Sequence, residues 1–180
     1  MKYLISLYFD ENTNKQICKY MNEVAMATGN DYMLVNKVPP HITVSSFEIR
    51  ETGEYDVVKQ LEMKLNEVLA DISVGDIQWV GCGAFMNSVL YLTPVLNEYL
   101  QIIMQSVYDG ISELPDVAIS RYYKPFQWLP HTTIGKKMQA ETLIKGFSVT
   151  QEAFGVIHGR VVRIGLAKAG PYEDIKVWEL

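Results

Sequence analysis

The sequence has few of the features that mark several large classes of protein. Only 2 of its 180 residues are cysteine, and neither Cys18 nor Cys82 belongs to a C-x-x-C pair, so a disulfide framework or a zinc module is not indicated. No apolar run approaches the ~20 residues of a transmembrane helix. The short apolar stretch at the N-terminus is followed at once by acids, unlike a signal peptide. We therefore expect a reduced, cytoplasmic protein that does not enter a membrane.

The common cofactor and metal motifs are missing as well. The sequence holds no G-x-G-x-x-G, no G-x-x-x-x-G-K-[ST] and no G-x-S-x-G, so neither a bound dinucleotide, nor a P-loop, nor an esterase nucleophile is indicated. None of the 3 histidines has a second histidine or a cysteine within four positions, which is a usual spacing of zinc ligands on one element. We expect no cofactor and no metal.

Positive charge is scarce and unevenly distributed. The chain has 16 Lys and Arg against 21 Asp and Glu, a net charge of −5, and the acidic excess lies in residues 1–90. A protein that coats long duplex nucleic acid is usually basic, so we do not expect such a partner. Residues 121–137, in contrast, contain four cations and no acid. A small nucleotide or an RNA terminus fits this distribution of charge.

The apolar content of 48% is enough for a substantial core in about one domain. Alternating apolar residues predict strands, and apolar residues three and four apart predict helices. The expected strands are 3–9, 31–36, 41–49, 72–81, 88–93, 117–120, one from His131, 155–168 and 175–179. Four helices are expected. The first is capped by Asp10 or Thr13 and ended by Gly29, the second covers 54–70, and the last covers 139–147. The third is capped by Thr93, has Pro94 at its first position, and points Leu96, Leu100, Ile103 and Val107 inward.

The order of the expected elements occurs twice along the chain. Each half reads strand, helix, strand, strand, helix, strand, which indicates an internal duplication with repeats at roughly 1–85 and 86–180. We predict a single bilobal α+β domain, residues 1–180, in which two lobes are related by a pseudo-two-fold axis and a cleft lies between them.

One short motif appears once in each half, as PPHITV and as LPHTTI. His41 and His131 are 90 residues apart, and each follows a proline and precedes a threonine by two positions. Residues i and i+2 of a strand point to the same face, so His41 projects together with Thr43, and His131 together with Thr133. Because proline belongs at the first residue of a strand, each histidine is expected near a strand end.

Two imidazoles and two hydroxyls are the equipment for cleaving a phosphodiester without a metal. Near their ordinary pKa, one histidine can act as a neutral base while the other acts as a protonated acid. The hydroxyls of Thr43 and Thr133 can bind nonbridging phosphate oxygens without adding charge. In-line attack then needs only orientation and two proton transfers.

These two motifs resemble those of the 2H phosphoesterase superfamily, which includes the 2′-5′ RNA ligase-like proteins and the RNA 2′,3′-cyclic phosphodiesterases. HITV matches the family pattern fully, whereas Thr132 in HTTI stands where a hydrophobic residue is usual. The resemblance implies antiparallel sheets around the central cleft, with helices on the outside. It also implies hydrolysis of a 2′,3′-cyclic phosphate, or chemistry at a 2′-5′ linkage, with His41 as general acid and His131 as general base.

The segment that leads into the second motif is a further candidate for substrate binding. Its aromatic side chains can stack on a base or ribose and its cations can hold a phosphate. The candidates are Arg121, Tyr123, Lys124, Phe126 and Trp128. The alternative is an ordinary loop whose aromatics pack on the lobe. Lys136 and Lys137 fit a solvated strand end, and His158, which lacks the flanking proline and threonine, fits a structural role.

Two other classes of function stay open. A non-catalytic protein that binds an RNA end or a nucleotide would keep the same cleft and hydrolyse nothing, so turnover distinguishes it from an enzyme. In a purely structural two-lobed protein, changing either histidine would alter stability but no ligand property. For the phosphodiesterase we expect a monomer.

Overall fold

The computed structural model describes residues 2–50, 54–86, 88–170 and 172–180. The strands are β1 (Lys2–Phe9), β2 (His41–Ile49), β3 (Gly75–Phe85), β4 (Val89–Pro94), β5 (Val117–Ile119), β6 (Thr132–Lys136), β7 (Ile157–Lys168) and β8 (Glu173–Glu179). The helices are α1 (Glu11–Thr28), α2 (Tyr32–Val35), α3 (Glu54–Leu69), α4 (Glu98–Ser112) and α5 (Ala140–Ala153), with a 3-10 turn, η1 (Arg121–Tyr123). The α+β class is confirmed.

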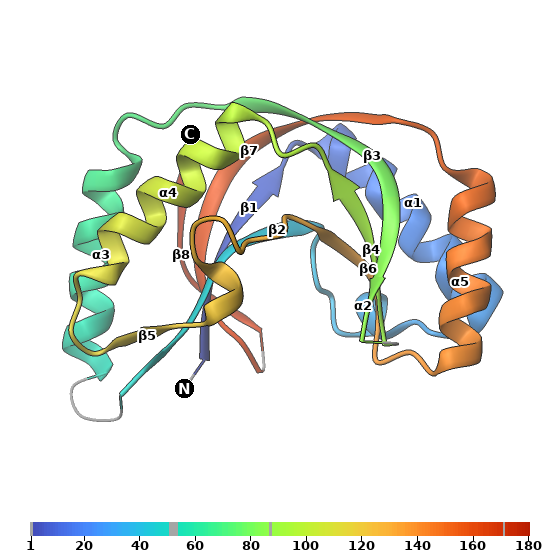
Figure 1. Cartoon of the computed structure of the whole chain (residues 1–180), viewed down its shortest axis with the longest axis horizontal. Helices are drawn as coiled ribbons and strands as arrows, with labels where there is room; N and C mark the ends of the chain where they lie inside the picture. The colour runs from blue at the N-terminus through green and yellow to red at the C-terminus, as the bar shows by residue number, and fades with distance from the viewer. Residues whose placement is uncertain (1, 51–53, 87, 171) are drawn as a thin grey trace.

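The strands form one antiparallel sheet bent into an arch. Its main path runs β5-β2-β1-β7-β3-β4-β6, and β8 also pairs with β7. The long strand β7 joins the two lobes, because its first part pairs with β3 and its later part with β8 along the same edge. Helices α3 and α4 lie outside one lobe and α1 and α5 outside the other (Figure 1). The predicted lobes, antiparallel strands and outer helices are therefore confirmed.

Each lobe takes elements from both halves of the chain. Helix α1, from the first half, packs against α5 from the second, and α3 packs against α4 in the same way. The inner strand order is β2-β1-β7-β3-β4-β6. Exchanging β1 with β4, β2 with β6 and β3 with β7 gives the same order read backwards. Among the strands in the described residues, β5 and β8 have no counterpart in this exchange. A duplication would produce this order, but the single domain and the repeat boundaries stay predictions.

Helix α1 follows its sequence signals closely. The Asp10 carboxylate accepts a hydrogen bond from the backbone N–H of Thr13 at 2.7 Å, which satisfies one of the free donors of the first turn. Gly29 ends the helix at φ 73°, a left-handed conformation that glycine adopts without a steric penalty. The buried residues of the helix are spaced at three and four positions: Thr13, Ile17, Tyr20, Met21 and Val24.

Two sequence predictions in the connecting segments were wrong. The expected strand 31–36 is the helical turn α2, in which Met33 is buried and Val35 is 68% exposed; an apolar run this short does not distinguish helix from strand. The fourth helix begins after Asn97, whose side chain accepts from the Leu100 N–H at 3.0 Å. Pro94 instead ends β4, and Leu96 is exposed rather than inward.

Helix α5 is longer than the predicted 139–147 and continues to Ala153. Its second half contains β-branched residues of lower helix propensity, which is why the sequence suggested an earlier end. The helix continues because Leu143, Gly146 and Thr150 form a buried face toward α1 and the sheet.

Both cysteines are free and half-buried at the edge of the core. Within the described part of the chain, none of the helices is long and apolar enough to cross a membrane.

Candidate active site

The fold brings the two histidine motifs to neighbouring strands. His41 is the first residue of β2, and His131 directly precedes β6, as the prolines predicted. Strands β2 and β6 contact each other although β1, β7, β3 and β4 separate them in the sheet order. Consistent with this proximity, positive charge on His131 contributes to lowering the pKa of His41. The bend of the sheet thus joins segments that lie 90 residues apart in the chain.

Both motif strands carry a β-bulge at the same motif position. In β2 the extra residue is Val44, which directly follows Thr43 and falls at a shift in the register with β1. In β6 the extra residue is Ile134, which directly follows Thr133 and falls at a shift in the register with β4. A bulge bends its strand and re-aims the adjacent side chains, and bulges are common beside active sites. The matched irregularities give the two His-x-Thr pairs the same local geometry.

Each imidazole is fixed by the carbonyl two residues before it. Nδ1 of His41 lies 2.8 Å from the Pro39 carbonyl oxygen, and Nδ1 of His131 lies 2.9 Å from that of Leu129. A carbonyl only accepts, so Nδ1 carries the proton in both rings. Because this bond fixes the tautomer, Nε2 is the nitrogen available for proton transfer in each histidine. The intervening prolines hold the preceding residues extended, which presents these carbonyls to the rings.

Burial lowers the pKa of both histidines below the ordinary imidazole value. At His41 the charges of His131 and Lys136 lower it further, while the Pro39 carbonyl and the Asp174 carboxylate act in the opposite direction. At His131 the Leu129 carbonyl partly offsets burial. Both rings are therefore mainly neutral at neutral pH in the free protein, and a bound phosphate would favour protonation.

The threonines of the motifs lie in different environments. Thr43 is buried, its backbone carbonyl accepts a hydrogen bond from Trp128 Nε1 at 3.0 Å, and its side chain interacts with that of Tyr123. Thr133 is half-buried in β6. Thr132, the departure from the family pattern, is fully buried, and its hydroxyl accepts a hydrogen bond from Trp79 Nε1 at 3.0 Å. A polar residue is tolerated there because a buried indole supplies its partner.

The structure separates the five predicted substrate-binding residues into two groups. Tyr123 and Trp128 are packed against Thr43 of β2. Arg121, Lys124 and Phe126 are exposed. The Arg121 guanidinium donates to the Tyr122 hydroxyl at 2.7 Å and lies over its ring, and Phe126 is fully exposed at φ 63°, an uncommon backbone angle for this residue type.

Sequence reasoning missed the aromatic and acidic side chains that surround the histidines. The ring centroids of Phe85 and Tyr91 lie 4.8 and 5.4 Å from that of His131, both edge-to-face. The Tyr172 ring centroid lies 6.5 Å from that of His41. These residues come from β3, β4 and the segment before β8. No local pattern could identify them, because only the strand register brings them to the motifs.

The family assignment rests on the match to a family model. The model, described as the 2′-5′ RNA ligase superfamily, matches residues 14–171 and thus both motifs. The chain belongs to the 2′-5′ RNA ligase superfamily. Members of this superfamily, the 2H phosphoesterases, act on phosphodiester bonds. A sequence comparison with curated proteins found no match.

Several solved structures of low sequence identity share the fold. A protein described as a phosphoesterase is 12% identical, with a TM-score of 0.65 over 99% of this chain and 98% of its own. E. coli LigT in complex with 3′-AMP is 13% identical, with a TM-score of 0.65 over 99% and 97% of the two chains. TT0787 of Thermus thermophilus is 15% identical, with a TM-score of 0.64 over 100% and 98%.

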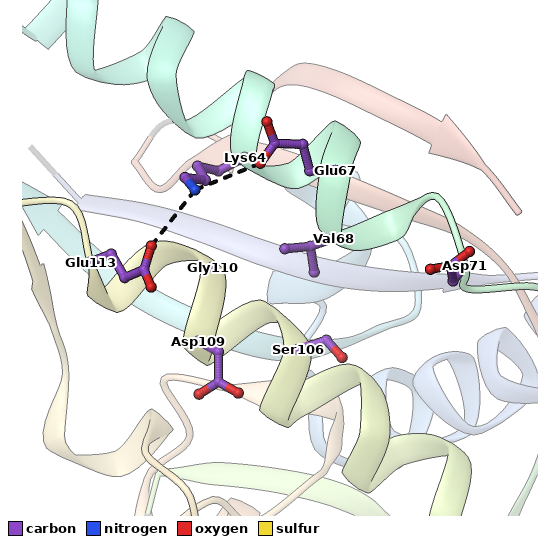
Figure 2. Close-up of a pocket in the computed structure, with 8 residues that line it drawn as sticks. All are labelled: Lys64, Glu67, Val68, Asp71, Ser106, Asp109, Gly110 and Glu113. Carbon is purple, nitrogen blue, oxygen red and sulfur yellow. Dashed lines mark ion pairs between the residues drawn. The ribbon is translucent and has the colours of Figure 1, made fainter.

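Grooves elsewhere on the molecule contain neither motif. One lies between α3 and α4, where Lys64 reaches Glu67 and Glu113 at 3.6 Å each (Figure 2). The other is lined by residues that include the exposed His158 and Arg160. Among the residues that the structure describes, no group of three or more His, Cys, Asp or Glu is placed to hold a metal ion. The absence of a metal requirement and the structural role of His158 stay predictions.

Proposed function

We propose that this protein is a metal-independent phosphodiesterase that acts on a 2′,3′-cyclic phosphate, or on a 2′-5′ linkage, of RNA or a small nucleotide. The observation that carries the proposal is the matched pair of imidazoles. His41 and His131 each have Nδ1 tied to a backbone carbonyl and Nε2 left for proton transfer, on strands that contact each other. General acid–base cleavage of a phosphodiester uses the Nε2 atoms of both histidines in one reaction.

The proposed reaction is in-line hydrolysis of the cyclic phosphate. Nε2 of neutral His131 takes a proton from water, and the water oxygen bonds to phosphorus. The bond between phosphorus and one ribose oxygen breaks on the opposite side, and protonated His41 gives its Nε2 proton to that oxygen. The product is a nucleoside monophosphate, and His41 regains a proton while His131 loses one to solvent. The assignment of acid and base comes from the family resemblance.

Thr43 and Thr133 hold the phosphate in this proposal. Each precedes a bulge and lies on the same face of its strand as its histidine. A hydroxyl donor aimed at a nonbridging oxygen adds no charge, so it leaves the protonation states of the imidazoles free to alternate. Tyr123 lies close enough to Thr43 to orient its hydroxyl. Arg121, Lys124 and Phe126 remain proposed contacts with the rest of the substrate.

The ligands of a structural neighbour support a nucleotide-sized substrate. E. coli LigT has been solved with 3′-AMP, with ATP, with phosphate and with NADP+. A neighbour from Kluyveromyces marxianus, Usb1, is 13% identical with a TM-score of 0.54. We carry over to this chain only the class of ligand, a small nucleotide or an RNA terminus. The absence of long duplex binding, the monomeric state and the cytoplasmic location stay predictions.

The test compares three single histidine variants. His41→Ala and His131→Ala should each lower turnover of a 2′,3′-cyclic nucleotide by at least ~10². His158→Ala is the matched control, because it removes the third histidine, which is exposed on β7, and should retain wild-type activity. Circular dichroism and urea unfolding should show that all three variants are folded.

The same assay separates the proposal from its main alternative. Near-full activity in a folded His41→Ala or His131→Ala variant would contradict the assignment. A wild-type protein that binds cyclic nucleotides, RNA ends and 2′-5′ oligonucleotides but turns none of them over would instead support a non-catalytic nucleotide-binding protein.

A further inference from the structure

The two histidine motifs are almost equivalent, but the elements around them are not. Strand β8 has no counterpart in the symmetric inner order of the sheet, and in the part of the chain that the structure describes it pairs with β7 alone. It places Asp174 opposite Ala167 of β7, and Tyr172 lies just before it in the chain. The Tyr172 ring centroid is 6.5 Å from that of His41, tilted by 33°. The C-terminal hairpin therefore adds polar groups to the surroundings of one histidine.

Tyr8, Tyr172 and Asp174 form a hydrogen-bonded cluster at this point. The hydroxyls of Tyr8 and Tyr172 each lie 3.0 Å from Asp174 Oδ1, and they also contact each other. Tyr8 is the register partner of His41 in β1 and is only 5% exposed. Its ring lies over Gly165, where an added Cβ would come within 2.5 Å of a ring carbon. Packing thus fixes Tyr8, and through it the carboxylate.

His131 has different neighbours. Phe85 and Tyr91 meet its ring edge-to-face and stack on each other at 4.2 Å between centroids. Aromatic rings pack against an imidazole but supply no counter-charge. The influences on its pKa are burial and the Leu129 carbonyl. This setting favours the neutral form, which is the form that a general base requires.

The groups that act on His41 come from several elements. Tyr8 faces it from β1, Tyr172 and Asp174 from the hairpin, and two basic groups, Lys136 and His131, from β6 and the residue before it. The charge of Lys136, and that of His131 when it is protonated, opposes protonation of His41, and the carboxylate of Asp174 favours it. Of these groups, Asp174 is the one that carries negative charge.

We propose that Asp174, oriented by Tyr8 and Tyr172, is a positioning residue that stabilises the protonated form of His41 and so makes His41 the general acid. The inference rests on the proposed function, because an acid is needed only if a phosphodiester is cleaved. It explains how two copies of one motif divide the two roles, since strand β8, which has no counterpart in the inner strand order, removes the symmetry at one of them. The proton that His41 gives to the leaving oxygen is regained from solvent.

A titration of the free protein tests the coupling without any turnover. Histidine ring signals would be followed by NMR against pH in the wild type, in Asp174→Asn and in Glu173→Gln, a matched control that removes the same charge one residue away. Asp174→Asn should lower the pKa of His41 and leave that of His131 unchanged, and Glu173→Gln should change neither. Tyr172→Phe should act in the same direction as Asp174→Asn but more weakly. An unchanged His41 titration in Asp174→Asn would overturn the proposal.

Kinetics with two leaving groups test the role of acid. For a 2′,3′-cyclic nucleotide at about pH 8, Asp174→Asn should lower kcat/KM by about threefold to tenfold. For a nucleoside 4-nitrophenyl phosphate, whose leaving group needs no proton, the same variant should stay within about twofold of the wild type. Equal losses on both substrates would overturn the proposal, because they would indicate a role in binding or structure.

The two experiments also separate this inference from the proposed function. A wild-type protein that cleaves neither substrate would overturn the proposed function and the acid assignment together, even if the titration showed the coupling. Turnover that requires both histidines but is unaffected by Asp174→Asn at every pH would leave the proposed function standing and overturn only this inference.

Discussion

At the scale of single residues, the hydrogen bonds at Nδ1 and the burial of both rings decide how the histidines ionise. Burial is the largest influence on each and lowers the pKa of both. Because its pKa is lowered, each ring becomes protonated only at a lower solution pH than an ordinary imidazole. The general base must be neutral, so its lowered pKa extends the pH range of activity to lower pH. The general acid must be protonated, so its lowered pKa ends the range of activity at a lower pH.

The pH dependence of the rate should therefore be a bell displaced to low pH. Because kcat/KM reports the free enzyme, its optimum should lie below about 6.5, the value of an unperturbed imidazole. The bell in kcat should lie at higher pH, because bound phosphate favours protonated His41. The measurement is kcat/KM and kcat from about pH 4.5 to 8.5 for the wild type and both histidine variants.

His131→Ala should flatten the acidic limb of this profile, where the base becomes protonated. His41→Ala should flatten the alkaline limb, where the acid loses its proton. A profile that is flat from about pH 5 to 8 would contradict the two-histidine mechanism. Exchanged limbs would contradict the assignment of roles and, with it, the role inferred for Asp174.

The motif threonines lead to a second prediction at this scale. Thr43→Val and Thr133→Val keep the shape of the side chain and remove the hydroxyl that would bind phosphate. A hydrogen bond to a charged group contributes roughly 1.5–3 kcal/mol, so kcat/KM should fall by about 10–100-fold. Thr132→Val is the matched control for kinetics, because its hydroxyl is already bonded to Trp79. Unchanged kinetics in both motif variants would show that the two threonines have only a structural role in their strands.

At the scale of elements, the loop before β6 and the strand β2 hold each other in place. Trp128 lies three residues before His131 and is bonded through Nε1 to the Thr43 carbonyl at 3.0 Å. One side chain thus connects the second motif to the first. It was predicted as a substrate contact, but its indole is 9% exposed and its hydrogen bond is to the protein.

Trp128→Phe should accordingly affect both stability and catalysis. The variant keeps an aromatic ring but leaves the buried Thr43 carbonyl without its donor, which costs about 1–3 kcal/mol in the free energy of unfolding. Displacement of Thr43 should also raise KM for a cyclic nucleotide. Urea unfolding and steady-state kinetics measure the two effects.

Trp178→Phe is the matched control for this change. The Trp178 indole donates to Asn66 Oδ1 at 2.7 Å, a hydrogen bond that joins β8 to α3 and involves neither motif. Its loss should leave the kinetics unchanged. Equal KM values for Trp128→Phe and the wild type would show that Trp128 does not position the site.

At the scale of the whole molecule, the bent sheet brings the two motif strands β2 and β6 into contact, and the proposed mechanism uses only side chains of the protein. The described residues include no cluster of three or more potential metal ligands, and the two imidazoles account for both proton transfers of the proposed mechanism. Hydrolysis of a cyclic nucleotide should therefore continue at the wild-type rate in excess EDTA. Complete loss of activity, restored by a divalent cation, would contradict the mechanism.

Local patterns in the sequence were enough to predict most of the elements and the motif. Alternation and helical spacing predicted β1, β2 and α1, because those patterns reflect local geometry and burial. The repeated Pro-His-x-Thr placed His41 and His131 at strand ends, because proline restricts the backbone on both sides. Predictions failed where the local sequence fits two structures about equally well. Residues 31–36 fit a strand or a helix, and Thr93 and Asn97 both fit the N-cap of α4.

The surroundings of the histidines, in contrast, follow from the tertiary fold. The contact between β2 and β6, the matched bulges and the Tyr8–Tyr172–Asp174 cluster depend on strand register and on the bend of the sheet. Register is set by pairing between segments far apart in the chain, and no local pattern encodes it. The two motifs are nearly identical in sequence, so the difference between their surroundings arises from the side chains that the fold brings to each, such as Tyr172 near His41 and Phe85 against His131.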